Sequence, residues 1–218
     1  MTRLTPLFGL MLLGCPTTNT DPAPGPGIFY GDLHVHSTNS VDVFALKLPL
    51  FGHDGRVTPM DHCQFARYCS QLDFWAITDH QEGAPPSAWE ESVAAVASCN
   101  AQYGGDGPDP ELVTFAGFEW QQSAPTPETD WGHKNVIFEG SAASDLPTRA
   151  IASADQVTSI DETLIEAAIS VASAMDPDND EIYVEMGEYA LDGATATACD
   201  EGVDVRDLPS DCVESASE

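Results

Sequence analysis

The hydrophobic residues of this chain fall into short continuous runs that alternate with segments of helical periodicity. Four apolar runs predict buried strands, at residues 28–35, 72–80, 112–118 and 135–138. Three segments with apolar residues three and four apart predict helices, at residues 58–72, 87–104 and 161–175. A last short run, at residues 182–186, predicts one more strand. This alternation predicts an α/β fold whose parallel strands form an open sheet or a closed barrel.

Two of the predicted helices carry start signals. In the first, Thr58 is the predicted N-cap, Pro59 suits the first helical position, and Asp61 can reach back to close a capping box. In the second, Ser87 and Glu90 have the same spacing and predict another capping box. Both signals support a helix after the first strand and another after the second.

Polar side chains stand where these strands end. In the first strand, residues two apart share a face, so Asp32, His34 and His36 are expected to point the same way. The polar side chains at or near the strand ends are His34, His36, Asp79, His80, Glu119 and, in the loop before the fourth strand, His133. Functional groups of α/β folds gather at the carboxyl ends of parallel strands, so we expect these side chains to converge.

Histidine and carboxylate side chains form a ligand set for Zn, Mn or Fe. A site with nitrogen and oxygen ligands and no thiolate favours catalysis, because a bound ion can supply hydroxide as a nucleophile near neutral pH. Taken singly, a His-x-His pair also occurs on protein surfaces, and Glu119 beside Trp120 could be a satisfied core carboxylate. Their joint placement at successive strand ends is what predicts a metal site.

Four stretches also resemble a known family. Residues 30–42, 72–80, 115–120 and 132–138 are similar to the opening motifs of the PHP (polymerase and histidinol phosphatase) superfamily. They are most similar to its large exported branch, catalogued as a domain of unknown function (DUF3604). The resemblance implies a distorted (β/α)7 barrel that binds two or three metal ions and hydrolyses phosphoesters.

The family motifs imply a role for each candidate residue. His34 and His36 match the first metal-binding pair, and His80 matches the histidine of the second motif. Glu119 matches the bridging carboxylate, and His133 the histidine ligand that follows it.

Three aspartates have implied supporting roles. Asp32 and Asp79 are expected to orient imidazoles by accepting their second N–H, and Asp42 lies where some members place a further ligand. Family members complete the site with later histidines, whereas this sequence has none after His133. We therefore expect residues 28–175 to form the N-terminal part of such a barrel, followed by a divergent acidic segment at 176–218.

The function predicted from these residues is that of a metal-dependent hydrolase. It is expected to be a phosphoesterase that acts on a small molecule through hydroxide held by one to three divalent ions. One alternative is a truncated, non-catalytic lipoprotein that binds metal or is only structural. Another is an amidohydrolase-type enzyme, which usually needs a carboxylated lysine at a strand end, where neither Lys47 nor Lys134 is expected.

The charge balance narrows the possible partners. The chain has 36 acidic and 7 basic residues and a net charge of −29. Residues 151–218 hold 18 of the acids and a single base, Arg206. Such a field repels phosphate backbones, so no nucleic-acid partner is expected.

The N-terminus has the pattern of an export signal. Residues 1–14 combine one arginine with a short apolar stretch, and the stretch ends in a Leu-Leu-Gly-Cys sequence typical of bacterial lipoproteins. We expect cleavage before Cys15, lipid on that cysteine and a flexible linker over residues 15–27. An ordinary secretory signal or a chance apolar start is the alternative. The expected location is the bacterial cell envelope, with membrane contact through the lipid alone.

Export places the remaining cysteines where disulfides persist. With Cys15 set aside for lipid, five remain: Cys63, Cys69, Cys99, Cys199 and Cys212. Cys199 and Cys212 are the expected pair near the C-terminus. Either Cys63 or Cys69 is expected to join Cys99, and the fifth cysteine to stay free.

Overall fold

The computed structural model describes residues 27–40, 42–43, 56–81, 85–122, 126–128, 130–151, 162–193, 197–200, 202–207 and 212–213. The main sheet has the strands β1 (Gly31–Val35), β2 (Phe74–Ile77), β3 (Val113–Gln122) and β4 (Gly132–Ile137), in that spatial order. The helices are α2 (Pro59–Phe65), α3 (Pro86–Tyr103), α5 (Glu162–Met175) and α6 (Asp180–Gly193). The short elements are the π-turn η2 (Ala66–Ser70), the 3-10 turns η4 (Ala143–Asp145), η5 (Pro177–Asn179) and η6 (Val205–Asp207), and the small strands β5 (Thr197–Ala198) and β6 (Cys212–Val213).

The predicted α/β class is confirmed, but the sheet is mixed. Strands β1, β2 and β3 run parallel, whereas β4 runs antiparallel to β3. The prediction of parallel strands is therefore wrong for the fourth. The chain from 123 to 131 is shorter than the dozen or so residues that a parallel crossover needs, so β4 can only turn back beside β3.

The sheet curls into a half-barrel. The side-chain amide of Asn135 on β4 donates to the carbonyl oxygen of Leu33 on β1 over 2.8 Å, which ties the two edge strands together. Gly117 lies where the curl brings backbones close: a Cβ there would be 2.6 Å from the carbonyl oxygen of Val136 and 3.2 Å from that of Ile77. A side chain at this position would push β4 away from β3.

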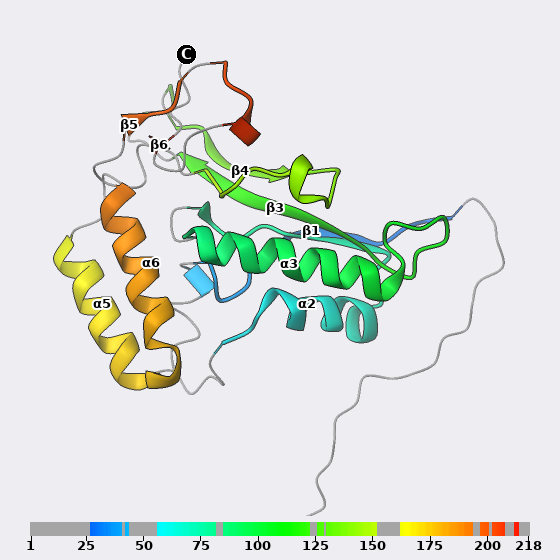
Figure 1. Ribbon diagram of the computed structural model, residues 1–218, viewed down its shortest axis with the longest axis horizontal. Helices are drawn as coiled ribbons and strands as arrows, with labels where there is room; N and C mark the ends of the chain where they lie inside the picture. Colours follow the sequence, from blue (N-terminus) through cyan, green and yellow to red (C-terminus); the bar gives the residue numbers. More distant parts are fainter. Residues whose placement is uncertain are drawn as a thin grey trace, which may run out of the picture.

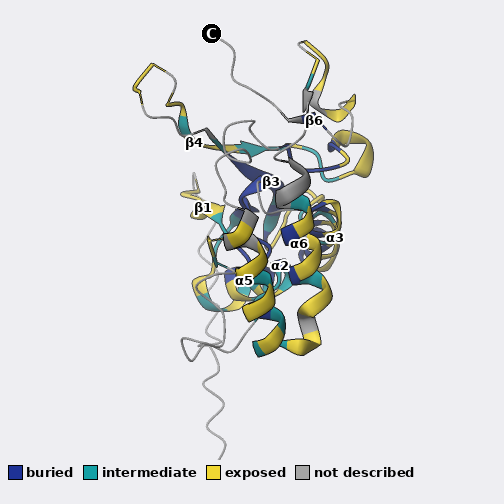
Figure 2. Ribbon diagram, turned by 90° about the vertical axis from the view of Figure 1, so that its left-hand side faces the viewer, coloured by how far each residue is buried: buried dark blue, intermediate teal, exposed yellow. Residues whose placement is uncertain are grey.

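Helices α2 and α3 pack against one face of the sheet (Figure 1). The apolar side chains buried in this layer include Trp75, Ile77, Trp89, Val96, Leu112 and Phe118. In Figure 2 the buried residues gather about β3 and α3, whereas most of the surface of α5 is exposed.

One predicted helix start is confirmed and the other is wrong. At α2, the Thr58 hydroxyl accepts from the Asp61 N–H over 3.2 Å, and the Asp61 carboxylate accepts from the Thr58 N–H over 2.8 Å. The N-cap of helix α3 is instead Pro85, two residues before the expected Ser87, and no side chain caps the helix. Ser87 is then already inside the first turn, because Pro86 takes the first helical position that its fixed φ favours.

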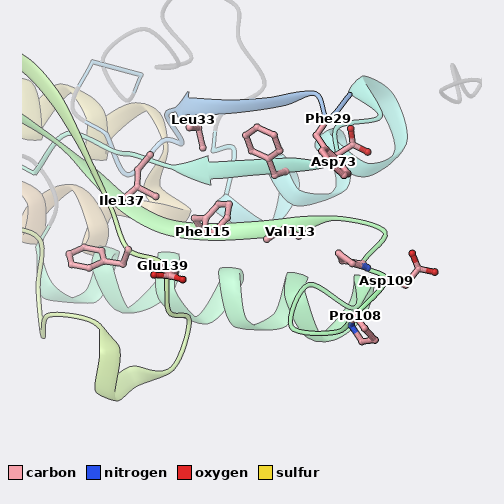
Figure 3. Close-up of a pocket in the computed structure, with 12 residues that line it drawn as sticks. Phe29, Leu33, Asp73, Pro108, Asp109, Val113, Phe115, Ile137 and Glu139 are labelled. Atoms are coloured by element: carbon pink, nitrogen blue, oxygen red, sulfur yellow. The ribbon is translucent and has the colours of Figure 1, made fainter. Parts of the chain in front are cut away.

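The opposite face of the sheet is open and apolar. A groove of about 770 Å³ runs along it, and Figure 3 shows the side chains that line it. Its apolar lining includes Phe29, Leu33, Phe74, Phe115 and Ile137.

The expected strand at 182–186 is helical instead, as part of α6. Helices α5 and α6 lie side by side, joined through η5 (Figure 1). Tyr183 and Gly187, one helical turn apart, are both buried, and the Tyr183 hydroxyl donates to the Asp176 carboxylate over 2.5 Å. Packing against α5 therefore overrides the strand preference of a short apolar run.

Both expected disulfides are present. Cys63 pairs with Cys99 and links α2 to α3, and Cys199 pairs with Cys212 beside β5 and β6. None of the five described cysteines is free, because Cys69 is disulfide-bonded too. The expectation of one free thiol among these five is therefore wrong.

The predicted signal (1–14) and Cys15 lie outside the described residues. Among the helices of the part that is described, none is long and apolar enough to cross a membrane.

Candidate metal centre

The predicted site residues meet at the end of the sheet where β1 and β2 finish. His34 is in β1 and His36 follows it directly. His80 comes just after β2 and forms a parallel bridge with Glu119 of β3. His133 lies in β4, not in the loop where the sequence placed it.

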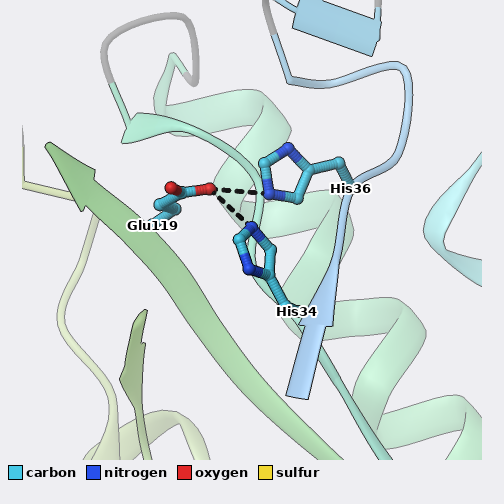
Figure 4. Close-up of side chains that lie close together, drawn as sticks. All are labelled: His34, His36 and Glu119. Atoms are coloured by element: carbon cyan, nitrogen blue, oxygen red, sulfur yellow. Dashed lines mark hydrogen bonds and ion pairs between the residues drawn. The ribbon is translucent and has the colours of Figure 1, made fainter. Parts of the chain in front are cut away.

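Glu119 is the centre of this cluster. Its side chain is 1% exposed, and its Oε2 atom lies 2.8 Å from His36 Nε2, 2.9 Å from His34 Nε2 and 3.5 Å from His80 Nε2. Its other oxygen, Oε1, contacts His133 Nδ1. Figure 4 shows His34 and His36 pointing at the same carboxylate oxygen. One buried carboxylate therefore touches four imidazoles.

Strand geometry explains this convergence. Side chains alternate along β3, and Glu119 stands opposite Asn135 of β4 while His133 stands opposite Gln121. His133 thus reaches Glu119 diagonally, across two neighbouring positions of one face. In β1 the pairing register with β2 shifts between Asp32 and Val35, and His34 and His36, at the end of this strand, both contact Glu119 of β3.

The charges in the cluster favour an ionised carboxylate. Burial raises the pKa of Glu119, but the hydrogen bond from His133, charge on His80 and the hydrogen bond from His34 lower it more. The net pKa of Glu119 lies below its usual value, so it is an anion at neutral pH. Around it the rings lie close, with centroids 4.8 Å apart for His34 and His36, and 5.0 Å apart for His36 and His80.

The ligand atoms suit a metal ion. Among the residues that the structure describes, three overlapping groups could hold one, and within each group the ligand atoms lie within 4.8 Å of one another. These groups are His34–His36–Glu119, His36–Asp42–His80 and His80–Glu119–His133.

Bond lengths test the fit more closely. A tetrahedral ion with bonds of about 2.0–2.1 Å keeps its ligand atoms about 3.3 Å apart. The separation of 3.5 Å between His80 and Glu119 already meets this, whereas those of 2.8 and 2.9 Å to His36 and His34 are shorter. An ion would fit between these atoms after a shift of about half an ångström.

One side of the cluster is open. The side chains of His34 and His133 are 56% and 49% exposed, whereas those of His36 and His80 are 11% and 9% exposed. His36 and His80 can bind an ion on its buried side. Solvent or a ligand can reach the ion past the half-exposed rings of His34 and His133.

The aspartates expected to orient imidazoles hold the backbone of the first motif. Asp79 accepts hydrogen bonds from the N–H and the hydroxyl of Ser37, over 2.5 and 2.8 Å. Asp32 accepts from the backbone N–H of His34 over 3.0 Å. Burial raises the pKa of Asp79 to about 7, although the hydrogen bonds from Ser37 oppose this shift. The described hydrogen bonds of both aspartates therefore fix the chain around His34 and His36.

Sequence reasoning missed Ser40. Its side chain is fully buried, and its hydroxyl oxygen lies 2.6 Å from Asp42 Oδ1, 3.1 Å from His36 Nδ1 and 3.0 Å from the backbone nitrogen of His80. A serine in a polar loop gives no signal in the sequence, because its contacts come from two strand ends. Asp42 also contacts His36 Nδ1, over 3.2 Å.

Comparisons with known proteins add no identity: no family model, curated protein or solved structure matches this chain.

Proposed function

We propose that this chain is a metal-dependent hydrolase whose divalent ion is held by His34, His36, His80, Glu119 and His133. The observation that carries the proposal is the convergence of four imidazoles on one buried carboxylate. A carboxylate buried in a protein is stable only when it is paired or binds a cation. A cluster that gathers four potential ligands around it is unusual for a purely structural carboxylate.

The chemistry follows from the donor atoms and their exposure. A divalent ion bound here would act as a Lewis acid towards water and substrate oxygens. Glu119 would supply the negative charge that holds it, and His36 and His80 would be its buried ligands. The half-exposed rings of His34 and His133 flank the side from which a small substrate approaches.

A phosphoester is the proposed substrate class, on the strength of the PHP-like motifs. The arginines that the structure describes are already engaged. Arg56, Arg67 and Arg206 pair with Glu91, Glu111 and Asp204, and Arg149 donates to backbone carbonyl oxygens. Neutralisation of a phosphoryl group would therefore come chiefly from metal ions, which suits a centre of more than one ion.

The amidohydrolase alternative gains no support from Lys134. Its position is opposite Trp120 in the β3–β4 ladder, so it alternates with His133 and faces away from the cluster. Its amine lies 5.6 Å from the Trp120 ring and also donates to the carbonyl of Trp131.

The test is hydrolysis of an aryl phosphate by purified protein with added Mn or Zn. A double variant, His34→Ala/His36→Ala, is expected to lose both turnover and bound metal. His62→Ala is the matched control, because His62 lies on α2 next to Trp75, away from the cluster. Equal turnover by wild type and double variant refutes the proposal. Metal bound by the wild type without turnover on any phosphoester would identify a non-catalytic metal-binding protein instead.

A further inference from the structure

Ser40 occupies a junction between two ligand-bearing strand ends. It lies in the loop after β1, fully buried, and its hydroxyl is within hydrogen-bonding distance of groups from three places in the chain. These are the Asp42 carboxylate, the His36 ring and the His80 backbone N–H. A hydroxyl has one hydrogen to donate and two lone pairs that accept. Three neighbours therefore use its whole hydrogen-bonding capacity.

The chemistry of the neighbours decides where the Ser40 hydrogen goes. The backbone N–H of His80 can only donate. The Asp42 oxygen lies 2.6 Å from the hydroxyl oxygen, which is the length of a short hydrogen bond from a hydroxyl to a carboxylate. The single hydrogen of Ser40 therefore points at Asp42, and the remaining lone pair faces His36 Nδ1 at 3.1 Å.

The ring of His36 must then supply the hydrogen of that last contact. Its Nδ1 atom has two neighbours, the Ser40 oxygen and the Asp42 oxygen at 3.2 Å, and both act as acceptors. We infer that Ser40 is a positioning residue that keeps the hydrogen of His36 on Nδ1 and so commits Nε2 to the metal. In metal sites the hydrogen bond at one ring nitrogen sets which nitrogen binds the ion.

The inference rests on the proposed metal centre and adds an element to it. The same hydroxyl also accepts the N–H of His80, so a single side chain couples the ligand at the end of β1 to the ligand at the end of β2. Loss of Ser40 should therefore disturb two ligands. Without Ser40, the Asp42 carboxylate can still accept the hydrogen of His36 Nδ1. Zinc affinity should therefore fall only in part.

Nuclear magnetic resonance of the histidine ring nitrogens tests the inference. In wild-type protein, His36 is expected to show a protonated Nδ1 both without metal and with zinc. In Ser40→Ala, a second form with the hydrogen on Nε2 should appear beside the first, and zinc affinity should fall about tenfold, at the lower end of the effect of outer-shell changes. The double variant Ser40→Ala/Asp42→Ala should lose about a hundredfold. Ser92→Ala removes another buried hydroxyl, on α3, and should bind zinc as wild type does.

The outcomes separate this inference from the proposed function. A wild-type His36 without a hydrogen on Nδ1 overturns the inference, whatever the affinities, and this holds even if Ser40→Ala fails to fold. A Ser40→Ala protein that binds zinc as tightly as Ser92→Ala also overturns it. If wild type binds no zinc, Mn or Fe, the proposed function fails, and the metal-free spectrum still decides where the hydrogen lies.

Discussion

Replacing Glu119 by glutamine is the most direct perturbation of the centre. The amide keeps the shape of the side chain but removes its negative charge. Any effect on metal binding is therefore due to the loss of that charge. Glu119 is 1% exposed and contacts all four histidines, and no compensating carboxylate lies as close to His34 among the described contacts. Glu119→Gln should therefore leave the sheet folded and weaken metal binding strongly.

The magnitude follows from the position of the charge. Outer-shell changes around a metal ligand cost about 10–100-fold in affinity. Glu119 is placed to contact the ion itself, so its neutralisation should cost more than about a hundredfold, or about 2.7 kcal/mol of binding free energy. The net lowering of its pKa means that this charge is present throughout the neutral range.

The assay is competition for zinc between the protein and a chelator of known affinity. Glu111→Gln is the control, because Glu111 is an exposed carboxylate whose ion-pair partner is Arg67. The control should bind within about threefold of wild type, well inside the cost of an outer-shell change. An affinity of Glu119→Gln within that same range would refute the assignment of Glu119 as the central ligand.

Four further changes have defined outcomes. Cys63→Ala/Cys99→Ala opens a loop of 36 residues and should lower the free energy of unfolding in urea by about 4 kcal/mol, so a loss under about 1 kcal/mol contradicts it. Gly117→Ala should destabilise by about 1–3 kcal/mol in the same assay, because the added Cβ meets the neighbouring strand; an unchanged midpoint argues against the tight curl. Asn135→Ala removes the hydrogen bond to Leu33, so it should lower the free energy of unfolding by about 0.5–1.5 kcal/mol and weaken zinc binding. If neither quantity changes, this hydrogen bond is not needed to hold β1 and β4 together. Zinc at a hundred times its dissociation constant should stabilise the fold by about 2.7 kcal/mol, and a chelator should reverse this stabilisation. A melting temperature that changes with neither zinc nor chelator excludes a bound ion.

The sequence predicted the convergence of the histidines on Glu119 better than the sheet that carries them. Period-two alternation placed His34 and His36 on one face, and the end of an apolar run located His80 and Glu119, because these patterns are local. His133 was expected near the cluster but on a loop, since nothing in its neighbours revealed that β4 turns back beside β3.

The errors have two physical causes. Ser87 has the spacing of a capping residue, yet two preceding prolines set the start of α3. The run around Tyr183 favours a strand locally, yet packing against α5 makes it a helix. Ser40 matters only through groups brought to it from distant parts of the chain. The last two depend on tertiary contacts that a local pattern does not contain, whereas the start of α3 follows from a competing local signal, the proline pair.

The apolar groove on the half-barrel has a practical consequence for anyone who purifies this protein. Side chains such as Phe115 and Leu33 line a groove that opens to water in the native state. Environment-sensitive dyes, which normally fluoresce with partly folded proteins, should therefore bind the correctly folded chain. A bright dye signal at room temperature would then be a property of the folded protein, and melting would be followed more safely by circular dichroism.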